Sequence, residues 1–476
     1  MPYLLDLVYV LAILAALPWL VYQAIRKGKY REGFAEKILG RVPRRDPADR
    51  RPCLWLHAVS VGEVNLLAPL VRQIALQRSD IQCVISTTTM TGMALARRKY
   101  PDLLIFYCPL DFSWAVRAAI RRVRPDVLVL AELELWPNLV RSARDFGARV
   151  AVVNGRLGEQ SFRGYRRIGF LVRRLLARID LVAVQDETCA ERFRRLGARP
   201  ETVHVTGSLK YDGAQTDRNN PVTARLRRLA GFAPEDVVFL AGSTQEPEEE
   251  IALATFQALR AQWPRLRLVL VPRHPDRFET VGRLLDRSGL PGQRRTALEA
   301  ESPDSRARIL LVDVVGELGA WWGTAQIAFV GGSLGNRGGQ NMIEPAAYGA
   351  AISFGPNTWN FRDIVATMLA RHAAVVIQSG DDLTAFVRHC LEEPAFAAAL
   401  GDRARELVSQ QLGATQRTFD LLEPLVGQHH PEALVVWSNA DGSHPPEARR
   451  ASTRQPRATP WVGGVATDSS SPERAP

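Results

Sequence analysis

The chain has 476 residues, 46% of them hydrophobic, which suits two or three folded domains and excludes a fibrous or wholly disordered protein. A formal net charge of +11 favours anionic partners such as nucleic acid, phosphorylated small molecules or an anionic membrane surface. The five scattered cysteines form no CxxC pair or Cys/His cluster, which argues against disulfides or a zinc site and favours a reducing compartment.

The first predicted element is an apolar helix over residues 3–22, YLLDLVYVLAILAALPWLVY, in which Asp6 is the only charged residue. Twenty helical residues span about 30 Å, the thickness of a bilayer's hydrocarbon core. Four basic residues follow between positions 26 and 31, and the positive-inside rule places such a flank in the cytoplasm. We therefore predict a membrane anchor over 1–25. The alternative is a buried or interfacial helix, because Asp6 and Pro18 weaken a membrane span.

The body of the chain alternates β-branched runs with amphipathic helical patterns, including an arginine-rich helical segment over 165–178. This alternation predicts an α/β fold with open parallel sheets. The strands expected in the first half cover residues 53–59, 81–87, 103–109, 126–132, 149–155, 181–186 and 202–207. Those expected in the second half cover 236–242, 266–272, 307–313, 325–332 and 350–355.

Two such series predict two Rossmann-like domains that face each other across a cleft. The first is expected over 26–212 and the second over 222–427, joined by a polar, turn-rich linker at 213–221. The remainder, 428–476, is rich in Pro, Ser, Thr, Ala and Arg and has no apolar periodicity. It is predicted to be a disordered tail.

The stretch LWLHAVSVGEV places Ser60, Gly62 and Glu63 just after the first expected strand. Ligands of open α/β sheets bind beyond the carboxyl ends of the strands. Glu63 there can act as a general base if burial raises its pKa toward neutrality. It can equally serve only to complement the dipole of the helix that follows. Both interpretations stay open from this stretch alone.

A second acidic pair, Glu132 and Glu134, lies in AELELWPNL, where another expected strand ends. These carboxylates could orient a hydroxyl-rich ligand, or they could be ordinary loop charges.

The second half contains three turns suited to a nucleotide. Arg273 follows the strand at 266–272, where its guanidinium can fork onto a phosphate. Gly316 and Glu317 lie at a strand-to-helix turn with main-chain N–H groups to offer. The glycine-rich stretch 329–351 predicts a loop and then a helix beginning near Asn341, with Glu344 placed to bind ribose hydroxyls. Tight packing is the alternative reason for these glycines.

Several sequence patterns are absent. The chain has no GxxxxGK[ST], no GxGxxG opening either domain and no GxSxG, which argues against P-loop, dinucleotide-binding and nucleophile-elbow enzymes. No convincing DxD motif is present, so we predict neither an obligatory divalent ion nor a cofactor. A nucleic-acid partner would rest on net charge alone, and none is predicted.

Nine motifs in this order resemble the 3-deoxy-D-manno-octulosonic acid (Kdo) transferases of lipopolysaccharide assembly. They are HAVSVGEV (57–64), STTTMTG (86–92), ELWPN (134–138), NGRL (154–157), GSLKYD (207–212), PRHPDR (272–277), VGEL (315–318), FVGGSL (329–334) and NMIEPAA (341–347). The resemblance covers the chain to about residue 425.

The resemblance implies a GT-B glycosyltransferase on the cytoplasmic side of the inner membrane. Such an enzyme moves Kdo from CMP-Kdo to a lipid A precursor, lipid IVA, with inversion and without a metal. It implies that Glu63 is the general base, with Ser60, Gly62, Glu134 and Lys210 as weaker site candidates. The residues that it assigns to CMP binding are Pro272, Arg273, Val315, Gly316, Glu317, Asn341, Met342, Ile343 and Glu344.

Two motifs depart from the family pattern, since QNMIE replaces HNPLE and VGE replaces an MGE-type turn. Asn341, Glu344 and Gly316 persist, so we expect nucleotide binding through the main chain and the carboxylate to be kept.

The alternatives to a Kdo transferase are a GT-B enzyme with another donor, such as a UDP-sugar, or a non-catalytic, membrane-tethered protein that binds nucleotide sugars or lipids. A group of arginines could meet a phosphorylated lipid headgroup or form a solvated helix face: Arg163, Arg166, Arg167, Arg173 and Arg174.

Overall fold

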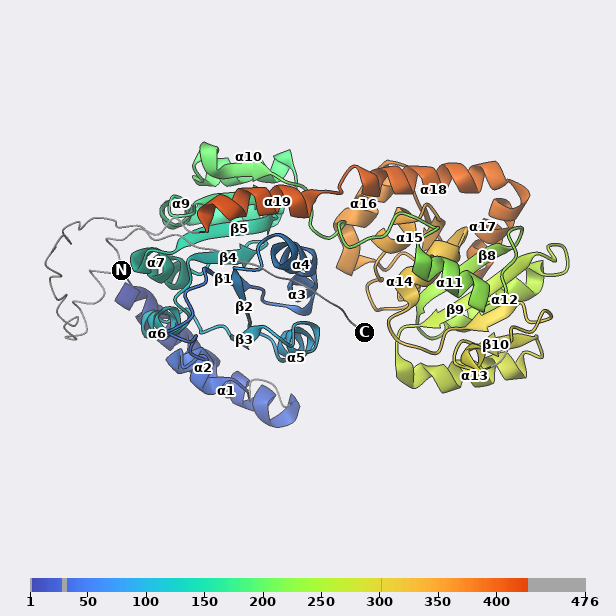
Figure 1. The fold of residues 1–476 in the computed structure, drawn as a ribbon, viewed down its shortest axis with the longest axis horizontal. Helices are drawn as coiled ribbons and strands as arrows, with labels where there is room; N and C mark the ends of the chain where they lie inside the picture. The colour runs from blue at the N-terminus through green and yellow to red at the C-terminus, as the bar shows by residue number, and fades with distance from the viewer. Residues whose placement is uncertain (1, 28–31, 301, 427–476) are drawn as a thin grey trace, which may run out of the picture. The chain divides into compact units, whose positions relative to one another are not determined.

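The structure is a computed structural model of the chain and describes residues 2–27, 32–300 and 302–426. It contains two parallel sheets of seven strands each, surrounded by helices (Figure 1). All twelve predicted strands are present, so the α/β interpretation of the alternating pattern is confirmed. The predicted tail, 428–476, lies outside the described residues.

The first sheet has the strand order β3-β2-β1-β4-β5-β6-β7. Its strands are β1 Cys53–His57, β2 Gln82–Thr87, β3 Leu104–Tyr107, β4 Val127–Ala131, β5 Arg149–Gly155, β6 Leu181–Val184 and β7 Val203–Val205. In β1, Trp55 packs into one hydrophobic core while Leu54 and Leu56 pack into another. Side chains alternate between the two faces of a strand, so both faces of this sheet are buried.

Helices supply the other side of each core. One face packs against α6 Ser113–Val123, α7 Pro137–Phe146, α8 Glu159–Arg167, α9 Gly169–Leu176 and α10 Glu187–Leu196. The other packs against α3 Val61–Leu66, α4 Ala68–Gln77, α5 Met90–Lys99 and α19 Ala414–Leu422. The helix predicted over 165–178 is divided into α8 and α9 at Ile168, where the backbone leaves helical geometry (φ −110°, ψ 28°).

The second sheet has the order β10-β11-β9-β8-β12-β13-β14. Its strands are β8 Val237–Thr244, β9 Leu266–Pro272, β10 Gly292–Arg294, β11 Ile309–Leu311, β12 Ile327–Val330, β13 Ala351–Phe354 and β14 Val375–Val376. The edge strands β10 and β14 were not predicted. They have three and two residues, too few for a recognisable alternation of apolar and polar positions.

Helices also cover both faces of the second sheet. One core includes side chains of α11 Pro221–Leu229, α14 Leu318–Trp321, α15 Ile343–Ala347, α16 Arg362–Ala370 and α18 Pro394–Ser409. The other includes side chains of α12 Glu248–Leu259, α13 Phe278–Arg287 and α17 Gly380–Glu392.

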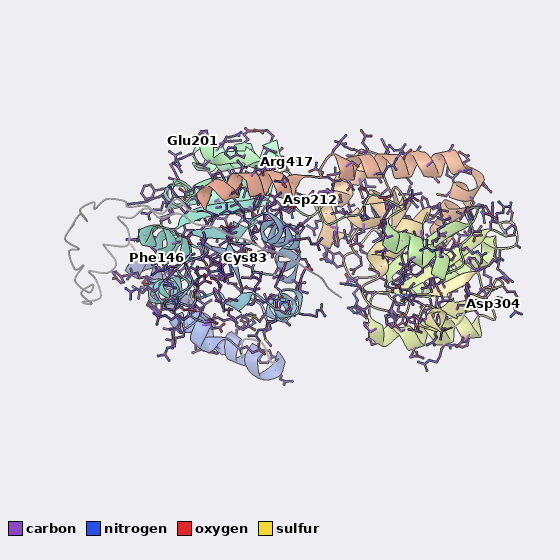
Figure 2. All side chains as sticks on the ribbon, viewed as in Figure 1. Cys83, Phe146, Glu201, Asp212, Asp304 and Arg417 are labelled. Carbon is purple, nitrogen blue, oxygen red and sulfur yellow. The ribbon has the colours of Figure 1, made fainter. Side chains whose placement is uncertain are left out.

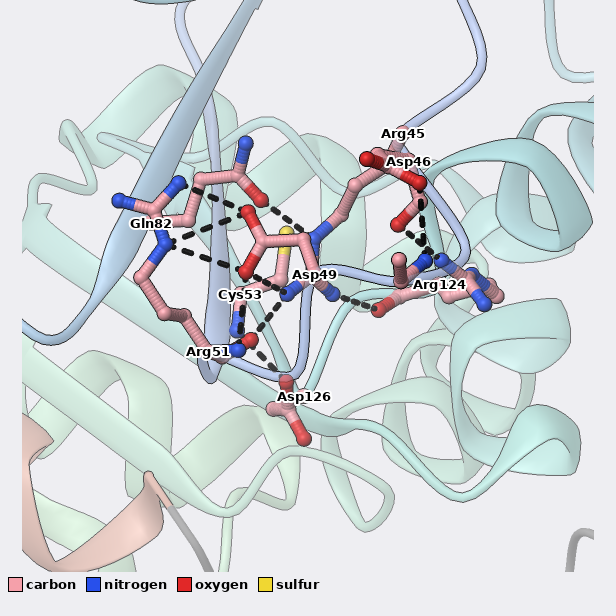
Figure 3. Close-up of polar contacts among 9 residues, drawn as sticks. Arg45, Asp46, Asp49, Arg51, Cys53, Gln82, Arg124 and Asp126 are labelled. Atoms are coloured by element: carbon pink, nitrogen blue, oxygen red, sulfur yellow. Dashed lines mark hydrogen bonds and ion pairs between the residues drawn. The ribbon is translucent and has the colours of Figure 1, made fainter.

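The amino ends of β1 and β2 are tied together by a buried arginine (Figure 3). Arg45 is 5% exposed, and its guanidinium donates to the carbonyl oxygens of Arg51 and Arg124 and to the side chain of Gln82. The main-chain N–H of Cys53 donates to Asp126 Oδ2 at 2.6 Å. These bonds set where the central strands begin, and therefore where their carboxyl ends lie.

The last described helix, α19, packs on the first sheet. Its residues Ala414, Phe419 and Leu422 belong to the same core as β1. Asp212 accepts hydrogen bonds from the main-chain N–H groups of Gly413, at 2.7 Å, and Thr415, at the start of this helix. Figure 2 shows where Asp212 and Arg417 of α19 lie. The range predicted for the second domain, 222–427, therefore contains a helix that packs in the core of the first.

The predicted amino-terminal helix is present as α1 Pro2–Lys27, beside α2 Phe34–Leu39. Within the described ranges, no helix is both long and apolar enough to cross a membrane, so the predicted anchor has no support from the described helices. The single carboxylate of α1, that of Asp6, is buried. It accepts hydrogen bonds from Ser113 N at 2.8 Å, from Ser113 Oγ at 2.5 Å and from Asn138 Nδ2 at 3.3 Å. Lys29 and Arg31 lie outside the described residues.

Asp6→Ala is expected to loosen α1 from α6 and α7. The change leaves buried donors of Ser113 and Asn138 without their acceptor, which costs about 1–3 kcal/mol. Hydrogen exchange by mass spectrometry should show faster exchange in α1 with little change in β1 and β4. Leu14→Ala is the control, because Leu14 lies on the same helix and is 57% exposed. Equal exchange in the two variants would contradict this docking contact.

Candidate active site

Glu63 is held at the carboxyl end of β1 by a reciprocal helix cap. Ser60 is the N-cap of α3, where its Oγ accepts from Glu63 N at 3.4 Å. The Glu63 carboxylate reaches back, accepting from Val59 N at 2.8 Å and from Ser60 Oγ at 3.0 Å. This is close to the S-x-x-E capping box. Glu63 also lies in the first turn of α3, where the helix-dipole interpretation expects it, and Gly62 is exposed beside it.

The same carboxylate also has the electrostatics of a base. Glu63 is only 9% exposed, and burial raises its pKa to about 7. The hydrogen bonds from Val59 and Ser60 oppose this shift, whereas the nearby negative charges of Glu134 and Glu132 add to it. A general base is most effective when its pKa lies near the working pH. Capping the helix and accepting a proton are therefore compatible roles for this residue.

Three threonines hold the turn that carries Glu63. The hydroxyls of Thr87, Thr88 and Thr89 all donate to the carbonyl oxygen of Val59, at 3.0, 3.2 and 3.3 Å. Gly92 leaves them room, because a Cβ there would lie 2.6 Å from Thr87 Oγ1. The motif STTTMTG was noticed in the sequence, but this positioning role was not predicted for it.

His57 lies behind the turn and is fully buried. Its Nδ1 is 2.9 Å from Ser86 Oγ, which also accepts from Trp55 Nε1 at 2.7 Å. Its Nε2 has no hydrogen-bond partner among the described residues. Burial lowers the pKa of His57 to about 4. The ring is therefore neutral near pH 7, and this histidine does not titrate in that range.

Two further carboxylates lie where β4 ends. Glu132, with a left-handed φ of +55°, forms an ion pair with Lys210, whose Nζ lies 3.1 Å from Glu132 Oε1. Glu134 Oε2 accepts from Trp136 Nε1 at 3.0 Å, and burial raises the pKa of Glu134. The charges of Glu134 and Glu132 add to the rise in the pKa of Glu63, and the charge of Glu132 adds to the rise for Glu134, which indicates that these carboxylates share one polar region. The structure thus brings the predicted Glu134 to Glu63, and Lys210 to Glu132.

The segment that carries Lys210 is anchored from two sides. Asn154, at the end of β5 with φ +54°, accepts from Leu209 N through its Oδ1 at 2.9 Å. Asp212 caps α19, and Arg417 of that helix donates to Thr206 O at 2.8 Å. The motifs NGRL and GSLKYD, more than fifty residues apart in sequence, are thereby joined. Asn154 is a positioning residue that the sequence analysis did not identify.

In the second domain, the charge of Arg273 acts on the carboxylate of Glu344. Arg273 is exposed just after β9, following the buried Pro272, and its N–H donates to Thr244 O at 3.0 Å. Burial raises the pKa of Glu344, while a hydrogen bond from Asn341 Nδ2, at 2.9 Å, and the charge of Arg273 oppose that rise. A cation next to a carboxylate can hold a phosphate and a hydroxyl of one ligand.

The helix expected near Asn341 begins two residues later. The five-residue helix α15 starts at Ile343, whose N–H donates to Asn341 Oδ1 at 3.1 Å. Met342 and Ile343 are 0% and 5% exposed and belong to the core. A ligand could meet these two residues only through the main chain. Of the N–H groups expected at this helix start for an anion, that of Ile343 is already paired with Asn341.

The turn at 315–317 exposes its main chain. Val315 is 76% exposed, and Gly316 has a φ of +97° with no heavy atom within 4 Å of a Cβ position. The carboxylate of Glu317 is already paired, accepting from Arg295 at 2.9 and 2.7 Å and from Trp321 Nε1 at 3.1 Å. The predicted contact by Glu317 would therefore come from its backbone.

Three N–H groups of the glycine-rich loop after β12 are paired within the protein. Those of Gly332, Ser333 and Leu334 donate to the buried carboxylate of Glu248, at 2.7, 2.9 and 3.0 Å. A main-chain contact between this loop and a nucleotide would therefore come from its other residues. In the described ranges, no group of three or more His, Cys, Asp or Glu side chains is arranged to hold a metal ion.

The buried Glu63 predicts a pH-dependent stability. Its pKa of about 7 in the folded state exceeds its ordinary value of 4.5, so its contribution is fully present below about pH 4.5 and is lost as the pH rises through 7. Glu63→Gln removes this loss. Relative to wild type, its free energy of unfolding should rise by on the order of 1–3 kcal/mol between about pH 5 and about pH 8.

Chemical denaturation at several pH values measures this difference. Glu201→Gln is the control, because Glu201 has a mostly exposed side chain. A stability difference between Glu63→Gln and wild type that does not change with pH would contradict the raised pKa.

The sequence of this chain is similar to those of known proteins. Residues 32–213 match the family described as 3-Deoxy-D-manno-octulosonic-acid transferase (kdotransferase). The chain is similar to the 3-deoxy-D-manno-octulosonic acid transferase of Bordetella pertussis, with 36% identity over 88% of this chain and 99% of the relative. The Haemophilus influenzae protein of the same name is 32% identical over 84% of this chain and 93% of its own length.

Among solved structures, UDP-GlcNAc 2-epimerase from Neisseria meningitidis, bound to UDP-GlcNAc, aligns with a TM-score of 0.52 at 12% identity. The alignment covers 78% of this chain and 100% of that one. At this identity the likeness concerns the fold alone. The sequence matches along nearly the whole length of two relatives show that the chain belongs to the 3-deoxy-D-manno-octulosonic acid transferase family.

Proposed function

We propose that this protein transfers Kdo from CMP-Kdo to a hydroxyl of a lipid A precursor, lipid IVA, in lipopolysaccharide biosynthesis. The observation that carries the proposal is Glu63, a buried carboxylate with a pKa of about 7 at the carboxyl end of β1, in a chain of the Kdo transferase family. Inverting transfer requires one base to remove the acceptor's proton, and Glu63 has the pKa for that role.

In the proposed reaction, the acceptor hydroxyl oxygen forms a bond to the anomeric carbon of Kdo. Its proton passes to a carboxylate oxygen of Glu63. The bond between the anomeric carbon and the phosphate oxygen of CMP breaks, and CMP leaves with the electron pair. Arg273 is assigned to the phosphate, where its charge stabilises the leaving group. Glu344 and Asn341 are assigned to the ribose, through the carboxylate and amide that already bond to each other.

The two sheets receive different substrates in this proposal. The polar region around Glu63, Glu134 and Lys210 is assigned to the sugar acceptor, because neutral and charged hydrogen-bonding groups suit a hydroxyl-rich molecule. The turns after β9, β11 and β12 are assigned to the nucleotide. A GT-B enzyme works with these two sites facing each other across a cleft, as the sequence analysis expects.

We further propose that the enzyme works at the cytoplasmic face of the inner membrane, with α1 as a membrane contact. Large apolar side chains of α1 are 46–70% exposed, which favours an apolar environment around this helix. They are Tyr3, Leu7, Val8, Leu11, Leu14, Leu17, Trp19 and Tyr22. The buried Asp6 holds the start of the helix against the first domain.

The region of α8 and α9 supports a second contact with an anionic lipid surface. Ile168, Phe170 and Leu171 are 51%, 71% and 48% exposed where the two helices meet. Five arginines of the same two helices are also exposed: Arg163, Arg166, Arg167, Arg173 and Arg174. Exposed apolar and cationic side chains on neighbouring helices suit an interface of lipid headgroups and acyl chains.

Wild type is expected to transfer Kdo to tetraacylated lipid A precursor without added metal, and Glu63→Gln is expected to lose this activity. The glutamine cannot accept the proton, so the rate should fall by roughly 10²–10⁴-fold. CMP-Kdo would be generated in place because it is labile, and mass spectrometry would read the product and the number of sugars added.

Binding of CMP, measured by calorimetry, serves as the control for this assay. Glu63→Gln should still bind CMP, and CMP but not UDP should inhibit the wild type. Full turnover by Glu63→Gln would overturn the base assignment. Inhibition by UDP instead of CMP would overturn the donor assignment.

The triple variant Arg166→Gln, Arg167→Gln, Arg174→Gln is expected to bind vesicles containing phosphatidylglycerol at least tenfold more weakly than wild type. Each basic residue near an anionic surface contributes about 1 kcal/mol. Sedimentation with vesicles at low and high salt measures the effect, which should shrink as salt rises.

A matched triple variant, Arg283→Gln, Arg287→Gln, Arg306→Gln, removes the same charge from exposed positions of the second domain. Equal losses for the two triple variants would contradict a specific role for α8 and α9.

A further inference from the structure

The first turn of α12 presents three consecutive glutamates, Glu248, Glu249 and Glu250, that follow β8. The first two are 1% exposed, whereas Glu250 is exposed. Lone carboxylates are rarely buried without strong partners. Each of the two buried groups has such a partner, and each partner lies in a different loop assigned to the donor.

Glu248 binds the glycine-rich loop after β12. Its Oε1 accepts from Ser333 N and Leu334 N, at 2.9 and 3.0 Å, and its Oε2 accepts from Gly332 N at 2.7 Å and from Gln245 N at 2.9 Å. A carboxylate can accept about four hydrogen bonds, so its capacity is filled. The loop is thus fixed to α12 through three successive N–H groups.

Gly331 admits this carboxylate. A Cβ at this position would lie 2.7 Å from Glu248 Oε2 and 2.6 Å from the Cα of Thr244. Either distance is too short for a real side chain. The need for glycine at position 331, the first glycine of FVGGSL, is therefore explained by the approach of Glu248 and Thr244.

Glu249 binds the other loop, the turn 272–277 after β9. Arg277 donates to it in a fork, from Nε to Oε1 at 3.2 Å and from Nη2 to Oε2 at 3.0 Å. A fork of two charge-assisted bonds restricts the orientation of both groups. Arg273, four residues earlier in the same turn, is the group assigned to the donor phosphate.

We propose that Glu248 and Glu249 are positioning residues for the nucleotide-sugar donor, because together they hold the glycine-rich loop and the 272–277 turn against one helix end. The inference rests on the proposed function, since the donor is assigned to these loops. Neither glutamate needs to touch the donor. If either loop is displaced, the groups that contact the donor are misplaced with it. A misplacement of about 1 Å weakens donor binding and lowers the rate of transfer.

Glu248→Gln tests this role. The amide turns one acceptor oxygen into a donor that opposes two backbone N–H groups, so the loop must shift. We expect the KM for CMP-Kdo and the Kd for CMP to rise by roughly tenfold or more, with the KM for lipid acceptor unchanged. A purely structural role would lower the folded fraction and the apparent kcat without changing the KM of the molecules that remain folded.

Glu250→Gln is the matched control, because it removes the same charge from the same helix turn at an exposed position. Glu249→Gln is the second variant should Glu248→Gln fold poorly, and it should raise the same two donor constants. Hydrogen exchange without ligand should be faster at residues 332–334 in Glu248→Gln than in Glu250→Gln.

Donor constants equal to those of Glu250→Gln in both variants would overturn the positioning role. A wild type that binds no CMP would instead overturn the proposed function, and the donor role of these glutamates with it. Wild-type binding together with unchanged binding by both variants would overturn this inference alone.

Discussion

Carboxylates that accept hydrogen bonds from main-chain N–H groups are the interaction on which both halves of the molecule depend. Turns at the ends of parallel strands leave N–H groups outside the sheet's ladders, and a buried N–H needs a partner. Glu63 supplies that partner to Val59, Glu248 to the glycine-rich loop, and Asp212 to the start of α19. Each carboxylate fixes a loop that local sequence alone would leave flexible.

The number of donors around a carboxylate separates two roles. Glu248 accepts from four main-chain N–H groups, which fill its hydrogen-bonding capacity. Glu63 accepts from one N–H and one hydroxyl, and burial dominates its pKa. The first arrangement favours an anchored loop, and the second leaves lone pairs for a proton near neutral pH. The two glutamates follow strands in the same way but differ in what surrounds them.

Parallel pairing explains why motifs far apart in sequence act together. β1 pairs with β2 and β4, so the turns that carry Glu63, the three threonines and Glu134 meet at one edge of the first sheet. β8 pairs with β9 and β12, which brings Glu248, Arg273 and the glycine-rich loop to one edge of the second. The order of the strands, not their spacing along the chain, assembles each site.

Apolar alternation and turn residues act locally, so they predict the α/β class, twelve of the strands and the position of Glu63 after β1. The sequence by itself could not decide whether Glu63 caps a helix or accepts a proton, since its pKa depends on burial by distant residues. Nor could the sequence show that Glu248 accepts hydrogen bonds from the glycine-rich loop, or that α19 packs on the first sheet. Those contacts join residues more than eighty positions apart, and only the tertiary structure brings them together.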